Sequence, residues 1–467
     1  MEQNLLYRSC AKTVQIKQAI QDILSVHSVL CLASLLLFAC VSWGVYQQIP
    51  DAIAHFDHDS FFYDTSARIA SGGTVSAHAE QAPIQTVIYP LFVSLLYRVS
   101  NNNVAAVVGF QLFLAMMTML LTYRIACLFF GATTATGALL LCSLNLGFIT
   151  YSQIVLAEIL LTFLLMLFFE RWVTATGRRS ASVALQSGIA LGLSLIVKPI
   201  ALVVPPVLLV IACFSQTARR FGDLYRIALM SMMSYGFVLL YMVRNYMLYA
   251  TFALAPMMSL NIYQCYLSKV IGRLEQRSSY EVAQTTLAFK ADNAFDETGW
   301  VTARTLFWQT VITHPATCAY VWSENVAKTL FGLFSTQFKQ LFAGRNDPQH
   351  PHSFFWLQGS LASRIYNYVI GGAVRPWIGW VALVEAFWSL IRWFCVLVAC
   401  LMLWHKRSWV PFWLCTLFIL TLAGMTGMDG CCRYRMTFEP ILIILTAYGI
   451  VCAYQKVQSL LGKRSAH

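Results

Sequence analysis

Ten apolar stretches, most of them long enough to cross a bilayer, dominate this chain of 467 residues. Inside a membrane the backbone of each span must satisfy its own hydrogen bonds, so spans of this kind fold as helices. The sequence therefore predicts an all-α polytopic membrane protein with about ten transmembrane helices. The stretches cover about residues 28–46, 104–123, 129–148, 156–173, 183–197, 199–214, 227–246, 383–403, 409–427 and 436–455.

The composition agrees with a membrane setting. Hydrophobic residues make up 58% of the chain, charged residues make up 11%, and the mean hydropathy is +0.63. These values exclude a soluble domain of the same length. A polar stretch precedes the first span, and that span has no small-residue cleavage pattern, so we expect it to stay as an anchor.

The net charge of +12 reports membrane topology rather than nucleic-acid binding. Lys and Arg concentrate in the loops on one side of a ten-helix count, as the positive-inside rule requires. We expect a multi-pass protein of the plasma (inner) membrane, with both termini cytoplasmic and the active site on the periplasmic face. The basic residues of the cytoplasmic side are Arg8, Lys12, Lys17, Arg124, Arg171, Arg178, Arg179, Arg219, Arg220, Arg226, Lys406, Arg407, Lys456, Lys463 and Arg464.

Two outer segments are large, and they divide the chain into three parts. Residues 1–246 form a transmembrane module whose first outer loop, 47–103, carries three aspartates, and residues 247–380 form an extracytoplasmic or interfacial subdomain. Residues 381–467 supply the last transmembrane helices and the tail. Within the second part, residues 318–338 are apolar apart from Glu324 and Lys328, and we favour a helix on the membrane surface over a span.

The first outer loop is the place where chemistry is expected. Asp57, Asp59 and Asp64 stand where a lipid-borne substrate meets water, and a carboxylate there can act as a general base or bind a cation. Asp57 and Asp59 point the same way in a strand but diverge on a helix, so the sequence leaves a divalent cation open. No cofactor is otherwise indicated.

Other chemistry finds little support in the sequence. No Walker loop, dinucleotide fingerprint or nucleophile elbow is present, which removes an ATP-driven pump and a serine hydrolase. None of the fourteen cysteines shows the spacing of a zinc site. Cys265 and Cys318 share the outer subdomain and could pair in an oxidising compartment.

Several separated segments resemble membrane-embedded glycosyltransferases of the C-type (GT-C) fold. This superfamily includes the protein O-mannosyltransferases and the transferases that add aminoarabinose to lipid A. The matching segments span most of the chain. They are Asp59 with Tyr63, Ala67 and Arg68, Pro83 with Tyr89-Pro90-Leu91, Tyr151-Ser152 through Glu158, Arg244-Asn245-Tyr246, and Arg433-Tyr434-Arg435 with Pro440.

The resemblance implies transfer of a sugar from a polyprenyl-phosphate carrier to a lipid, glycan or protein acceptor at the outer membrane surface. In an inverting displacement one carboxylate takes the acceptor proton, and Asp59 is the expected base, with Asp57 and Glu158 as further catalytic candidates. Cations at outer helix ends are expected to hold the carrier phosphate. These cations are Lys198, Arg244, Arg433 and Arg435, and the other expected substrate-binding residues are Tyr63, Arg68 and Tyr89.

Two other functions remain open at this stage. A lipid or glycan flippase is also polytopic, but transporters usually contain repeated halves with broken helices near the midplane, and no repeat is visible here. A polymerase or ligase that uses a polyprenyl-diphosphate glycan differs in its donor. Neither the sugar nor the acceptor can be read from the sequence, and nucleic acid is not an expected partner.

Overall fold

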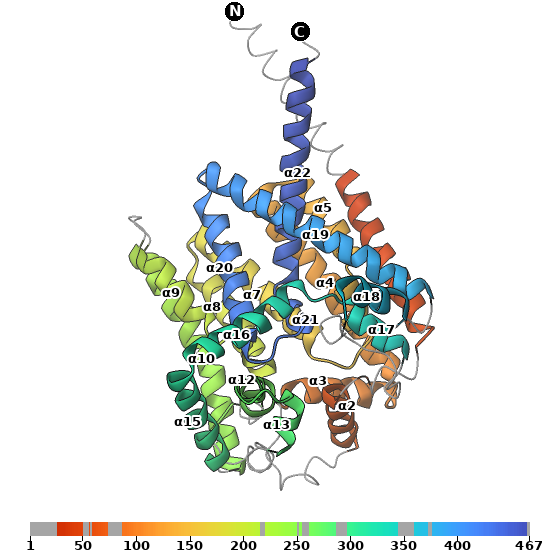
Figure 1. Cartoon of the computed structure of the whole chain (residues 1–467). Helices are drawn as coiled ribbons and strands as arrows, with labels where there is room; N and C mark the ends of the chain where they lie inside the picture. Colours follow the sequence, from red (N-terminus) through yellow and green to blue (C-terminus); the bar gives the residue numbers. More distant parts are fainter. Residues whose placement is uncertain are drawn as a thin grey trace, which may run out of the picture.

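The structure is a computed structural model made of helices, with no strand in the part of the chain that it describes (Figure 1). The prediction of an all-α membrane protein is confirmed. The described residues are 26–49, 56, 58–72, 86–214, 220–249, 252–254, 261–285, 297–343, 359–371 and 376–464.

Each of the ten predicted apolar stretches coincides with an apolar helix in the structure. Seven helices in the described residues are long and apolar enough to span a membrane. They are Val26–Tyr46, α4 (Val104–Phe130), α7 (Glu158–Arg178), α10 (Arg220–Tyr249), α19 (Pro376–His405), α20 (Trp409–Met425) and α22 (Glu439–Arg464).

The other three predicted stretches are shorter helices. They are α5 (Ala132–Ser143), α8 (Ala181–Val197), and the short η1 (Pro199–Ala201) continued by α9 (Val204–Phe214). Pro199 lacks a backbone donor and disfavours helical conformation at the preceding residue, which separates α8 from η1. An additional short apolar helix, α3 (Ile88–Ser100), was not predicted as a span.

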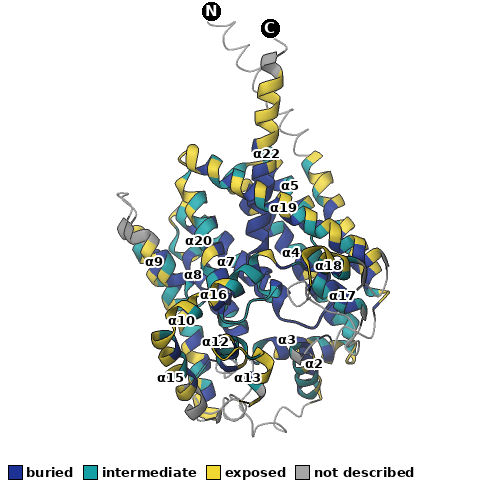
Figure 2. Cartoon of the chain, viewed as in Figure 1, coloured by how far each residue is buried: buried dark blue, intermediate teal, exposed yellow. Residues whose placement is uncertain are grey.

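Helix α22 runs through the centre of the bundle. It packs against α19, α5 and α4, and residues of its first half such as Ile441 and Leu445 are fully buried. Its last turns project beyond the bundle, where Tyr454 and Val457 are exposed (Figure 2). The buried first half of α22 therefore anchors the residues just before it, which include Arg433 and Arg435.

The segment predicted to be the first outer loop contributes α2 (His58–Ser71), which packs against α3. Asp64 on α2 accepts a hydrogen bond from the Tyr97 phenol of α3 and pairs with Arg68 at 2.8 Å. The Arg68 guanidinium also lies over the Tyr97 ring, 4.7 Å from its centre. This cluster fixes α2 on α3, and so fixes the position of Asp59 in the first turn of α2.

The described residues of the predicted extracytoplasmic segment 247–380, which we call the outer subdomain, contain a small hydrophobic core formed by Tyr263, Leu267, Val282 and Val321 with their neighbours. No helix of this region in the described residues is among the candidate spans. Cys265 and Cys318 are both free thiols. Its helices are η2 (Asn261–Leu267), α12 (Ser268–Leu274), α13 (Ser279–Thr285), α15 (Glu297–Thr313), α16 (Pro315–Phe331), α17 (Ser335–Ala343), α18 (Leu361–Tyr366) and η4 (Asn367–Gly371).

Residues 318–338 do not form one continuous helix. Helix α16 ends at Phe331 and α17 begins at Ser335, and α16 packs against α12 and against the loop that precedes α21 (Cys432–Arg435). Neither helix is long and apolar enough to be a candidate span, which agrees with the preference against a span here.

Candidate active site

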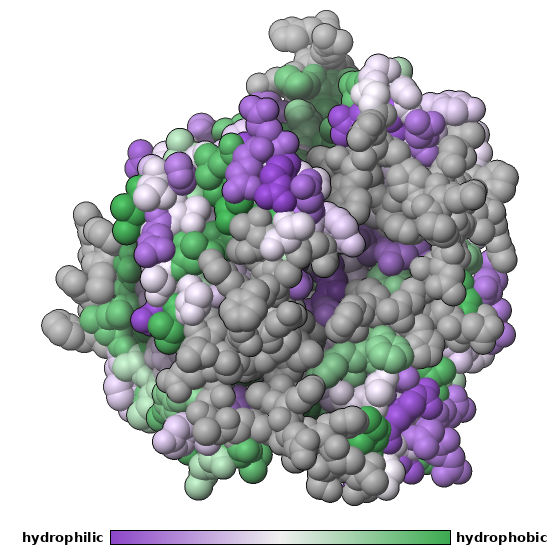
Figure 3. All heavy atoms as spheres, turned by 60° about the horizontal axis from the view of Figure 1, so that its bottom comes forward, coloured by the Kyte–Doolittle hydropathy of each residue, from purple (hydrophilic) through white to green (hydrophobic). Residues whose placement is uncertain are grey.

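A cavity of about 430 Å³, lined by charged and by apolar side chains, lies at the end of the bundle that faces the outer subdomain. Figure 3 views the molecule with this end turned forward and shows hydrophilic side chains gathered in a recess near its middle. The lining residues are Asp59, Tyr63, Thr86, Val197, Lys198, Pro199, Ile200, Asn261, Ile262, Met425, Thr426, Met428, Asp429, Cys431, Arg433 and Tyr434.

Lys198 enters the cavity from the break between α8 and η1. It is the C-cap residue of α8 and has an extended backbone, because Pro199 follows it. Its Nζ lies 2.5 Å from Oε1 of Glu158 and 5.9 Å from the centre of the Tyr434 ring. The Lys198 ammonium is thus held at the C-terminal end of α8, where it lines the cavity.

Arg433 is the connecting residue of the site. Its Nε donates to Oε1 of Glu158 at 2.5 Å, and its Nη2 donates to Oδ2 of Asp59. Lys198 and Arg433 therefore share one oxygen of Glu158, and the second carboxylate, that of Asp59, accepts from Nη2 of Arg433. We call these four residues, Asp59, Glu158, Lys198 and Arg433, the cavity cluster. They come from four separate segments of the chain.

Glu158 is the first residue of α7, where a carboxylate is favoured by the helix dipole. The turn before it is held by Gln111, whose amide nitrogen donates to the carbonyl oxygens of Ser152 at 3.2 Å and Ile154 at 2.8 Å. The Glu158 Oε2 atom is buried, and no donor in the described residues reaches it. Glu158 lies behind the two cations and does not itself line the cavity.

Tyr63 and Tyr89 form the aromatic support beneath the site. Tyr63 lines the cavity and meets Tyr89 edge to face, with ring centres 4.9 Å apart. The Tyr89 phenol donates to Oε1 of Gln111 at 2.8 Å. Tyr89 is thus tied to the residue that holds the turn before Glu158, and it does not line the cavity.

Three other predicted site residues lie away from the cavity. Arg68 pairs with Asp64, and Arg244 bonds its neighbour Asn245 at 2.7 Å. Arg435 is buried and pairs with Glu439 at 2.8 Å. Asp57 falls outside the described residues.

The described residues offer no set of ligands for a metal ion. No group of three or more His, Cys, Asp and Glu side chains converges within them. Asp59 is bonded by a guanidinium, and its neighbour Asp57 belongs to the part that is not described. The divalent cation that the sequence left open at Asp57 and Asp59 finds no further ligands among the described residues.

Sequence reasoning missed Asp429 and Lys269. Asp429 lines the cavity, and its carboxylate accepts a hydrogen bond from the Tyr434 phenol at 2.9 Å. Lys269 Nζ donates to the backbone oxygen of Asp429 at 2.7 Å. The available signal was an acidic residue in an outer loop, four residues before the Arg-Tyr-Arg motif.

Comparison with known proteins gives similarity in structure only. No family model and no curated protein sequence matches the chain. The oligosaccharyltransferase of Archaeoglobus fulgidus in its apo form is similar over 93% of this chain and 52% of its own, with 14% identity and a TM-score of 0.48. The oligosaccharyltransferase AglB of this archaeon, in complex with an inhibitory peptide and a dolichol-phosphate, is similar over 94% and 52%, with 12% identity and a TM-score of 0.48.

A third structure of the archaeal enzyme, in complex with Zn and sulfate, is similar over 91% of this chain and 49% of its own, with 12% identity and a TM-score of 0.49. The chain thus spans about half the length of these enzymes. They are glycosyltransferases of the C-type fold, the superfamily that the sequence motifs resemble. At these identities and TM-scores the similarity assigns neither donor nor acceptor.

Proposed function

We propose that this chain is an integral-membrane glycosyltransferase that moves a sugar from a polyprenyl-phosphate carrier to an acceptor on the outer face of the membrane. One observation carries the proposal. Lys198 and Arg433 converge on Glu158 beside a cavity, and Asp59 stands on that cavity within reach of Arg433. The arrangement offers a site for an anion and a carboxylate next to it.

The carrier phosphate binds to Lys198 and Arg433. Hydrogen bonds between charged groups are the strong ones, and Arg is suited to phosphate oxygens. Glu158 holds the two cations close together and offsets part of their mutual repulsion. During transfer the phosphate gains negative charge as a leaving group, so preorganised cations stabilise the transition state more than the bound donor.

Asp59 acts as the general base. The acceptor oxygen forms a bond to the anomeric carbon, the bond from that carbon to the phosphate oxygen breaks, and the acceptor proton passes to Asp59. The carrier leaves as a polyprenyl phosphate monoester. A bound phosphate competes with Asp59 for Arg433, and loss of that ion pair makes the carboxylate a stronger base.

An apolar seam next to the cavity suits the polyprenyl chain. On one side, the cavity wall of Pro199 and Ile200 continues along α9 to Val204 and Leu208. On the other side, Met425 of the cavity wall is followed down α20 by Phe418. Helices α9 and α20 contact each other, and a second small pocket between them is lined almost wholly by apolar side chains.

The outer-face location rests on where the basic residues lie. Glu158 opens α7 beside the cavity, whereas near the other end of α7 Glu170 pairs with Arg124 at 2.8 Å and Arg171 at 3.2 Å. Basic loops favour the cytoplasmic side, which puts the cavity outside. In intact cells, a membrane-impermeant maleimide should label a cysteine introduced at the exposed Tyr280 but not one at the exposed Tyr454. The reverse pattern would overturn this orientation.

The deciding experiment supplies the purified full-length protein in lipid nanodiscs with three kinds of donor. These are polyprenyl-phosphate-linked sugars, nucleotide sugars and polyprenyl-diphosphate-linked glycans. We expect release of polyprenyl phosphate and a glycosylated acceptor from the first donor only. Turnover of a nucleotide sugar without a carrier, or of the diphosphate donor alone, would contradict the proposal, and so would movement of a lipid-linked glycan across the bilayer without covalent change.

A further inference from the structure

One part of the cavity wall is formed by the segment Met428–Cys431 and by residues of η2 in the outer subdomain. Asn261 and Ile262 of η2 line the cavity beside Met428 and Asp429. An acceptor that arrives from water should meet this wall, because η2 belongs to a region with no candidate membrane span in its described residues. Asp429 is the one charged residue among these four.

The outer subdomain holds the Asp429 loop in one position. The side-chain amide of Asn325 on α16 donates to the backbone oxygen of Gly427 at 2.9 Å. Lys269 on α12 donates to the Asn325 side-chain oxygen at 3.1 Å and to the backbone oxygen of Asp429. Gly430 has a φ of +72°, and a Cβ there would lie 2.5 Å from the Cα of Asn325. Only glycine fits this close approach of the two backbones, so a larger residue at position 430 would push the Asp429 loop away from α16.

The two carboxylates on the cavity have different neighbours. The Asp59 carboxylate is bonded by the Arg433 guanidinium, whereas the Asp429 carboxylate accepts from two neutral groups, the Tyr434 phenol and the Cys265 thiol. Burial raises the pKa of Tyr434 well above its usual value, so the phenol keeps its proton and remains a donor. A carboxylate has about four acceptor positions, and the phenol and the thiol fill two of them.

We infer that Asp429 is an acceptor-binding residue, whose carboxylate accepts a hydrogen bond from a hydroxyl or ammonium group of the acceptor beside the hydroxyl that reacts. The inference rests on the proposed transferase function and deepens it. With Asp59 on the same cavity, Asp429 repels an anionic acceptor at close range. The site therefore selects a neutral or cationic, hydroxyl-rich acceptor such as a sugar residue.

The test uses three octyl glycosides that match in size and differ in charge: the glucoside, the cationic glucosaminide and the anionic glucuronide. Transfer from a polyprenyl-phosphate-linked sugar is followed for the full-length protein and for Asp429→Asn. The parental protein should use the glucosaminide and glucoside well and the glucuronide poorly. In Asp429→Asn the acceptor KM for the glucosaminide should rise about 10- to 100-fold, as expected for a hydrogen bond to a charged group, with donor KM unchanged.

Two controls separate binding from structure. The Asn amide oxygen can still accept from Tyr434, and Lys269 bonds the backbone, so Asp429→Asn should melt at the parental temperature. Asp429→Glu restores the charge and should recover the preference for the glucosaminide over the glucuronide. A parental acceptor KM and a parental order of acceptors in Asp429→Asn would overturn the inference while leaving the transferase function intact. If the transferase function itself is wrong, the parental protein releases no polyprenyl phosphate with any of the glycosides.

Discussion

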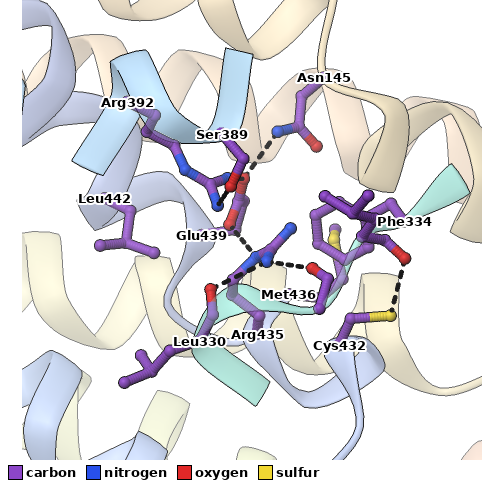
Figure 4. A network of polar contacts seen from close by, with 12 residues as sticks. Asn145, Leu330, Phe334, Ser389, Arg392, Cys432, Arg435, Met436, Glu439 and Leu442 are labelled. Carbon is purple, nitrogen blue, oxygen red and sulfur yellow. Dashed lines mark hydrogen bonds and ion pairs between the residues drawn. The ribbon is translucent and has the colours of Figure 1, made fainter. Parts of the chain in front are cut away.

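Two clusters in this protein use the same chemistry, a glutamate between two cations, in different surroundings. The cavity cluster pairs Glu158 with Lys198 and Arg433. The second, which we call the core cluster, consists of Asn145, Arg392, Arg435 and Glu439. In it Glu439 pairs with Arg392 and Arg435 at 2.8 Å each and accepts from the Asn145 amide at 2.8 Å (Figure 4).

Access distinguishes the two clusters. The side chains of Arg435 and Glu439 are 1% and 0% exposed, whereas those of Arg433 and Asp59 are 13% and 24% exposed. Nη1 of Arg435 donates to the backbone oxygens of Leu330 and Gly332, and the guanidinium lies 4.1 Å from the centre of the Phe334 ring. A charge that is buried and paired supports the fold, and a charge that faces a cavity can bind a ligand.

The largest expected effect concerns the carboxylate on the cavity. Asp59→Asn keeps the size of the side chain but cannot take a proton, so turnover should fall about 10²- to 10⁴-fold with the melting temperature unchanged. The measurement is the initial rate of polyprenyl phosphate release at saturating donor. Asp64→Asn on the same helix is the contrasting variant: it should lower the melting temperature, because Asp64 bonds Tyr97 and Arg68, and it should lose less turnover than Asp59→Asn, because Asp64 does not line the cavity. Full activity in Asp59→Asn would remove this residue from the mechanism.

The second prediction compares the two glutamates directly. Glu439→Gln leaves two buried guanidinium groups without their carboxylate, which should cost about 3–5 kcal/mol and reduce the yield of folded protein. Glu158→Gln should cost less stability, because Lys198 and Arg433 keep contact with the cavity, but it should weaken donor binding. Thermal unfolding in detergent, measured on both variants, checks the order. Equal losses of melting temperature in the two variants would mean that exposure to the cavity does not distinguish the cavity cluster from the core cluster.

The Arg433 and Arg435 pair shows what the sequence could and could not reveal. Both stand in one motif and were both expected to bind phosphate. Residues two apart on a helical turn point to different sides, so α21 sends Arg433 to the cavity and Arg435 into the core. Which side carries the ligand depends on α7, α19 and α22, and that packing is not visible in a four-residue motif.

Other parts of the site followed from local rules. The apolar stretches predicted the helices, the end of the stretch 183–197 put Lys198 at a helix end, and the first predicted outer loop indicated Asp59. Asp429 was missed because its position depends on contacts of Gly427 and Gly430 with Asn325, about a hundred residues earlier in the chain. Long-range packing of this kind leaves no periodic signal.

The smallest expected effect concerns a buried cation whose hydrogen bond goes to a carbonyl. Lys339 on α17 donates to the backbone oxygen of Tyr368 and lies over the Tyr368 ring, and burial lowers the pKa of its ammonium from the usual 10.5 to about 8. Between these two pKa values the Lys339 side chain is protonated in the unfolded chain and neutral in the folded one. The free energy of unfolding should therefore rise with pH from about 8 to 10.5.

Lys339→Met removes this titration and is the control for that effect. The difference in melting temperature between the parental protein and Lys339→Met should shift in favour of the parental protein by a few degrees from pH 7 to pH 9.5. A constant difference across this range would show that the Lys339 ammonium is not disfavoured by folding. The contrast with Glu439→Gln then measures what a carboxylate partner contributes to a buried cation.

The central claim is that Lys198 and Arg433 bind the phosphate of a polyprenyl carrier. Native mass spectrometry of the purified protein with polyprenyl phosphate tests it most directly, with the parent alcohol polyprenol as the ligand that lacks only the phosphate. The account predicts a one-to-one complex with polyprenyl phosphate, little complex with polyprenol, and at least a tenfold loss of phosphate binding in Lys198→Met and in Arg433→Met. Equal binding of the two lipids, or parental binding of polyprenyl phosphate in both variants, would contradict it.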